Sequence, residues 1–88
     1  MFEVEFSREL TRKMLKIQKK NKMMFDAIIK KIREIKKNPE HYKPLKYSMK
    51  DYRRVHIMKS FVLVFKVNRS ENRIIFEDFD HHNKIYKK

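Results

Sequence analysis

Arg54 and His56 are two side chains that together can bind a phosphate and transfer a proton. They lie in segment 52–57, which alternates in the manner of a strand, shortly before the apolar segment 61–67. Because side chains in a strand point alternately to opposite faces, Arg54 and His56 share one face. A guanidinium can clamp a phosphate through paired hydrogen bonds, and an imidazole can transfer a proton near neutral pH. We therefore expect this strand to hold a phosphate at a fixed place.

The net charge indicates what kind of partner to expect. The chain has 24 Lys and Arg against 11 Asp and Glu, a formal charge of +13. A nucleic acid fits this excess better than a membrane surface, because the sequence has no long apolar run. Most of the lysines in the expected helices have a simpler explanation as solvated surface residues.

The length of 88 residues predicts one domain, 1–88, with a thin hydrophobic core. The chain has no cysteine, which excludes disulfides and thiolate metal sites and suits a reducing cytoplasm. Residues 1–6 alternate apolar and acidic side chains and lack the features of a signal peptide, so a cytoplasmic location is expected. Glycine is absent as well, which leaves Asn38, Asn68 and Asn72 to supply left-handed turns.

The elements that must position Arg54 and His56 begin with a short strand over 2–6 and two helices. The first helix carries Leu10, Met14 and Ile17 on one stripe. Asn21 marks a break, after which isoleucines at helical spacing predict a second helix that ends near Asn38.

The remaining chain predicts three strands, roughly 51–58, 60–67 and 73–79, with a short helix or an extended tail after Asp80. Short connections make these strands an antiparallel three-strand meander. The expected fold class is thus α+β: the helical hairpin packs on one face of the sheet, and the N-terminal strand pairs within the same sheet.

This order of elements, and the residues on the last three strands, resemble the RelE/ParE superfamily of toxins from type II toxin-antitoxin systems, closest to archaeal RelE-like toxins. The resemblance rests on Leu45-Lys46, on segments 52–57 and 61–65, and on the ending 80–86. It implies a ribosome-dependent mRNA endonuclease that is neutralised by a cognate RelB-like antitoxin, in a heterotetramer or a higher complex.

The same resemblance carries functional residues over to this chain. Arg54 and His56 match the family's paired basic residues, and Tyr86 matches its C-terminal tyrosine. The chain departs from the family at Val62 and His82, where many members have arginine.

The chemistry can also be judged from the residues alone. Cleavage of RNA through its own 2′-hydroxyl needs a base, an acid and positive charge on the phosphorane. Arg54 can clamp the phosphate, His56 can serve as the base, and His82 or Tyr86 can supply the proton. No metal and no cofactor is expected. Further cations are expected to hold the RNA backbone, namely Lys46, Lys50 and Arg53.

Several alternatives remain open at this level. His56 can be a structural strand residue, Arg54 can cover the sheet with its stem, and Tyr86 can pack on the core. Among Tyr42, Tyr47 and Tyr52, which suit stacking on unpaired bases, at least one is expected only to pack a loop. The whole protein can instead be a ParE-like inhibitor of DNA gyrase, or an RNA- or ribosome-binding module without chemistry.

The acidic residues before the C-terminus have two explanations of their own. They are expected to be charge partners of the basic helices, with a magnesium site as the alternative. These residues are Glu77, Asp78 and Asp80.

Overall fold

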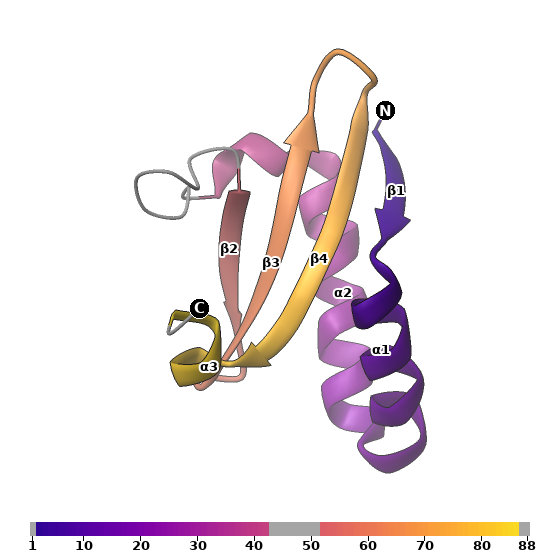
Figure 1. Ribbon diagram of the computed structural model, residues 1–88, viewed down its shortest axis with the longest axis vertical. Helices are drawn as coiled ribbons and strands as arrows, with labels where there is room; N and C mark the ends of the chain where they lie inside the picture. Colours follow the sequence, from indigo (N-terminus) through magenta and orange to yellow (C-terminus); the bar gives the residue numbers. More distant parts are fainter. Residues whose placement is uncertain (1, 43–51, 87–88) are drawn as a thin grey trace.

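Two amphipathic helices form a hairpin against one face of a four-stranded sheet in the computed structural model, which describes residues 2–42 and 52–86 (Figure 1). The elements follow one another as β1 (Glu3–Phe6), α1 (Arg8–Lys20), α2 (Lys22–Lys37), the 3-10 turn η1 (Pro39–His41), β2 (Tyr52–Ile57), β3 (Phe61–Asn68), β4 (Arg73–His81) and α3 (His82–Tyr86). The predicted α+β class and the predicted order of elements are confirmed, and the tail after Asp80 forms the short helix.

Side-chain caps explain where the two long helices begin. The Ser7 side chain accepts a hydrogen bond from the Leu10 N–H at 3.0 Å, so Ser7 is the N-cap of α1. Asn21 separates the helices: its own N–H bonds to the Ile17 carbonyl, and its side chain accepts from the Met24 N–H at 3.1 Å. One asparagine therefore ends α1 and caps α2, which produces the tight hairpin.

The sheet has the strand order β1-β4-β3-β2 and is mixed. The last three strands form the predicted antiparallel meander, while β1 pairs in parallel with β4 over Arg73–Phe76. A bulge shifts the register between Val64 and Phe65, since Val64 pairs with Asp78 but Phe65 pairs with Phe76. Beyond Phe76, β4 has no β1 residue beside it.

The core lies between the hairpin and the sheet. The apolar stripes of both helices are buried there against aromatic residues of the central strands. The fully buried members include Leu10, Ile28, Ile35, Leu63, Phe65, Ile74 and Phe76. This cluster fixes the helix-side face of the sheet and leaves the opposite face for other contacts.

The left-handed residues differ from the expected ones. Only Asn72, with φ of 58°, takes that conformation as predicted, whereas Asn38 has φ of −153°. The β2–β3 turn instead uses Met58 and Lys59, with φ of 54° and 68°. Asn68 contributes through its side chain, which accepts hydrogen bonds from residues 70 and 71.

None of the helices in the described residues is long and apolar enough to cross a membrane.

Candidate active site

Arg54 and His56 project from the outer face of the sheet, the face opposite α1 and α2. Ile57 is buried in the helix-side core and Val55 packs against this core, so His56 between them and Arg54 before them point the other way. A separate cluster on the outer face confirms this, because Tyr52 packs there against buried side chains of β3 and α3. The predicted separation of polar and apolar residues on β2 is therefore confirmed.

The helix α3 folds back from the end of β4 onto the outer face (Figure 1). Ile85 of α3 packs on Val62 and Val64 of β3, and all three are buried. The N–H of His82 donates to the Ser60 carbonyl at 2.7 Å, which ties the start of α3 to the β2–β3 turn. These contacts hold His82 beside the end of β2.

His82 and His56 meet as a result of this arrangement. Their rings stack with centroids 5.6 Å apart and an interplanar angle of 21°, and His56 is exposed. Arg54 lies two residues before His56 on the same face, opposite Val64 in the register, and is half-buried. The structure thus places three of the predicted catalytic residues, Arg54, His56 and His82, on one face of the sheet.

Three other predicted residues are not placed by the structure. Tyr86 is the last residue of α3, next to Ile85, but its side chain lies outside the described part of the molecule. Lys46 and Lys50, expected to hold the RNA backbone, belong to the segment between η1 and β2 that is likewise not described.

Arg53 lies apart from the other cations, on the helix side of β2. Its guanidinium Nη1 donates to the Tyr42 carbonyl at 2.8 Å. The Tyr42 ring stands edge-on to Phe65, with centroids 5.8 Å apart, and burial raises the pKa of Tyr42. Arg53 and Tyr42 therefore fasten the end of η1 to the sheet, as expected for at least one of the tyrosines. The geometry gives Arg53 this structural role, and its contact with RNA stays an untested prediction.

Lys66 on β3 is a cation of the outer face that was not singled out from the sequence. Its Nζ lies 5.6 Å from the centroid of the Tyr52 ring, the residue that faces it across the two strands. Alternation along β3 from Val62 through Val64 to Lys66 was the available signal. Val62 itself is fully buried opposite His56, so an apolar side chain occupies this position of the outer face.

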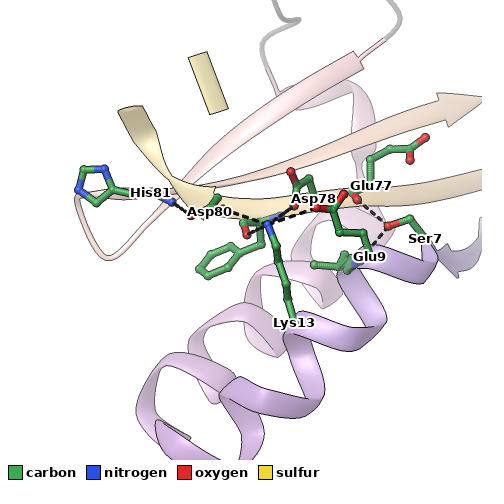
Figure 2. Close-up of polar contacts among 9 residues, drawn as sticks. Ser7, Glu9, Lys13, Glu77, Asp78, Asp80 and His81 are labelled. Atoms are coloured by element: carbon green, nitrogen blue, oxygen red, sulfur yellow. Dashed lines mark hydrogen bonds and ion pairs between the residues drawn. The ribbon is translucent and has the colours of Figure 1, made fainter. Parts of the chain in front are cut away.

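The acidic residues of β4 are held by Lys13 of α1 (Figure 2). The Lys13 Nζ donates to Asp78 at 2.7 Å, to Asp80 at 3.0 Å and to the Phe79 carbonyl at 3.2 Å. Next to it the Ser7 hydroxyl donates to the Glu77 carbonyl at 2.6 Å. Asp78 and Asp80 are therefore charge partners of a basic helix, as predicted. Lys13 binds them on the part of β4 beyond Phe76, where β1 no longer pairs with this strand.

The pKa values of this cluster follow from burial and charge. Burial alone lowers the pKa of Lys13, but its hydrogen bonds to Asp78 and Asp80 and their charges outweigh burial, so the pKa is raised. Burial alone raises the pKa of Asp80, yet the bonds from Lys13 and the His81 N–H and the nearby positive charges lower it overall. The three side chains thus form a charged structural latch.

Within residues 2–42 and 52–86, no three His, Asp or Glu side chains converge in a way that could hold a metal ion. The described side chains of the outer face instead combine two imidazoles with a guanidinium. Such a set can transfer protons to and from a phosphodiester and balance its negative charge.

Comparison with known proteins identifies the fold with a group of toxins. The chain is 49% identical over all of its 88 residues to RelE4 of Methanocaldococcus jannaschii, of which it covers 94%. Two solved structures at 21% and 22% identity share the fold. A YoeB/ParE toxin from Agrobacterium tumefaciens has a TM-score of 0.82, with 92% of this chain and 99% of that one covered. A YoeB-YefM complex from Staphylococcus aureus has a TM-score of 0.79, with 93% and 98% covered.

The family model of the ParE toxin of type II toxin-antitoxin systems matches residues 4–86, from β1 to the end of α3. The matched range spans the positions of Arg54, His56 and His82. The chain therefore belongs to the ParE toxin family of type II toxin-antitoxin systems.

Proposed function

We propose that this toxin is a ribosome-dependent endonuclease that cuts mRNA without a metal, through attack by the RNA 2′-hydroxyl. The observation that carries the proposal is the stack of His56 on His82, with Arg54 on the same strand face. RNA cleavage needs a base and an acid near one phosphate, and the geometry supplies two imidazoles 5.6 Å apart.

The reaction assigns one role to each side chain. His56 in its neutral form takes the proton of the 2′-hydroxyl, and the 2′-oxygen forms a bond to phosphorus. The bond from phosphorus to the 5′-oxygen breaks, and protonated His82 delivers a proton to that oxygen. Arg54 neutralises the negative charge that builds up on the phosphorane. The products are a 2′,3′-cyclic phosphate and a 5′-hydroxyl end, and Tyr86 is proposed to position the RNA.

The partner that would silence this activity is an acidic antitoxin, in a heterotetramer or a higher complex. An open apolar cavity of about 220 Å³ between β1, α1 and α2 supports such docking. Its walls include Phe6 and Leu15, which are 42% and 55% exposed. Because the surrounding chain is strongly basic, an amphipathic segment with acidic flanks suits the cavity. The YoeB-YefM complex of Staphylococcus aureus shows that one protein of this fold does assemble with a partner.

The test is cleavage of a message on translating ribosomes, followed by mapping of the cut ends. The wild-type protein should produce ends that carry a 2′,3′-cyclic phosphate. Arg54→Ala should lower the rate by roughly 100-fold or more, because a preorganised charge at the phosphorane is lost. Arg12→Ala removes the same charge from the exposed surface of α1 and should keep most of the activity. Equal losses in both variants would contradict the assignment of Arg54.

A second candidate function is inhibition of DNA gyrase. It is favoured by the ParE description of the matching family model and by Val62, which is fully buried at a position where the resemblance to RelE-like toxins implies arginine. Intact message together with inhibited supercoiling by purified gyrase would establish this function in place of RNA cleavage. If neither cleavage nor gyrase inhibition is observed, the protein is an RNA- or ribosome-binding module without chemistry.

A further inference from the structure

A polar groove of about 250 Å³ runs between α2 and the end of β2. The residues that line it and matter here are Ala27, Lys30, Lys31 and Glu34 from α2, and His56 and Met58 from β2 and its turn. We infer that this groove is a second subsite for single-stranded RNA, in which Lys30 binds a backbone phosphate next to the one at His56. The inference rests on the proposed function.

His56 connects the groove to the candidate active site. Its ring stacks on His82, and the same residue lines the groove. The helix α3 covers the outer face over β3, since Ile85 is buried against Val62 and Val64. An RNA strand at His56 therefore has its open path across the β2 edge and into the groove.

The charges of the groove favour a polyanion. Lys31 and Glu34 neutralise each other, with their Nζ and Oε1 atoms 3.1 Å apart. Lys30 is exposed and, among the described residues, has no ion-pair or hydrogen-bond partner, so it supplies the net positive charge. Since the phosphate backbone dominates affinity for nucleic acids, such a lysine is suited to a phosphate contact.

The position of the groove at the sheet edge suits an extended strand. β2 is the outermost strand of the described sheet, so its far side carries main-chain groups that the sheet does not use. Ala27 has a small side chain one turn before Lys30 and Lys31, which leaves the floor of the groove open. The apolar cavity at Phe6 and Leu15, by contrast, suits a protein segment and lies on other elements.

The experiment measures binding without cleavage. The probe is a fluorescein-labelled 2′-O-methyl oligoribonucleotide, which has no 2′-hydroxyl to attack, and anisotropy gives Kd at several salt concentrations. Lys30→Ala should weaken binding by about three- to tenfold and reduce the slope of log K against log salt by about 0.7, the value for one single-strand phosphate contact. Lys16→Ala, an exposed lysine of α1 with the same charge change, should leave both nearly unchanged.

A second variant fills the groove without altering the charge. Ala27→Leu should also weaken binding of the probe. Circular dichroism and urea unfolding check that this variant is folded. In the ribosome assay, Lys30→Ala should raise KM and leave kcat close to that of the wild type.

The inference is overturned if the wild-type protein does not bind the probe, or if Lys30→Ala and Lys16→Ala weaken binding of the probe equally. It is also overturned if Lys30→Ala weakens binding of the cognate antitoxin and leaves binding of the probe unchanged. Failure of the proposed nuclease activity looks different. In that case the wild type leaves messages uncut on ribosomes, whereas binding of the probe still depends on Lys30.

Discussion

Two clusters of charged and polar side chains lie at opposite borders of the sheet and differ in what surrounds them. At the β4 edge, Lys13 is enclosed by Asp78 and Asp80, which bind it at 2.7 Å and 3.0 Å. At the β2 border, the exposed His56 stacks on another histidine instead of on a carboxylate. The first arrangement satisfies its charges within the protein, while the second leaves an imidazole accessible.

In this very basic protein, some cations hold the fold and others can act on a ligand. A lysine with two carboxylates gains little from a phosphate, because it would first have to leave them. An exposed imidazole beside a second one can accept or give a proton without breaking an ion pair. The comparison predicts that mutations in the two clusters affect different measurements.

The largest expected effect is on cleavage by the histidine stack. His56→Ala should lower the cleavage rate on ribosomes by about 100-fold or more, as for loss of a general base, and change the urea midpoint little. His41→Ala, which removes an exposed histidine of η1, is the matched control and should cut normally. Since residues that act as a unit are not additive, His56→Ala with His82→Ala should cost about as much as His56→Ala alone. Fully additive losses of rate would show that the two histidines do not act as a unit.

The reverse pattern is expected for the latch. Lys13→Met removes the cation that pairs with Asp78, whose side chain is 10% exposed, and leaves two carboxylates close together. The free energy of unfolding should fall by about 2 kcal/mol, measured by urea denaturation. Lys16→Met, on the exposed side of α1, should change it by less than about 0.5 kcal/mol. A stable Lys13→Met variant that no longer cleaves RNA would contradict the purely structural role of Lys13.

Most of the fold could be predicted because it rests on local patterns. Alternation identified β2 and β3, helical spacing placed Ile28 and Ile35 in the core, and Ser7 marked the start of α1. The left-handed turn at Met58 and Lys59 could not be predicted from residue preference, since neither residue type favours positive φ.

The site was harder to predict than the fold because it depends on long-range placement. His56 and His82 were both candidates, but nothing local indicates that α3 folds back and stacks one ring on the other. Arg53 was expected to hold the RNA backbone, and nothing local indicates that its guanidinium also binds the Tyr42 carbonyl. Lys66 became visible only when the register placed it opposite Tyr52.

A smaller effect is expected at the turn that connects the histidines. Lys59 has φ of 68°, a conformation that is unfavourable for a residue with a Cβ, and the carbonyl of its neighbour Ser60 accepts the His82 N–H. Lys59→Gly should raise the free energy of unfolding by about 0.5 to 1 kcal/mol, because glycine adopts this conformation without the Cβ clash. Lys16→Gly, in the middle of α1, should lower it by about 1 kcal/mol. Destabilisation by Lys59→Gly would show that the turn is not strained.

The smallest effect is the pH dependence of the latch, which can be isolated by subtracting the unfolding free energy of Lys13→Met from that of the wild type. Asp80 has a pKa below its usual 3.8 in the folded protein, so its contribution is present above pH 3.8 and is lost as the pH falls through the folded pKa. Lys13 has a pKa above 10.5, so its contribution is present below pH 10.5 and is lost as the pH rises through the folded value. The difference in unfolding free energy between the wild type and Lys13→Met should therefore be constant between these limits and shrink beyond each of them.

The control is the difference in unfolding free energy between the wild type and Lys16→Met. It should stay near zero at every pH, since Lys16 has no carboxylate partner among the described residues. If the difference in unfolding free energy between the wild type and Lys13→Met stays unchanged at pH 2, Lys13 stabilises the sheet by packing of its aliphatic stem rather than by its charge.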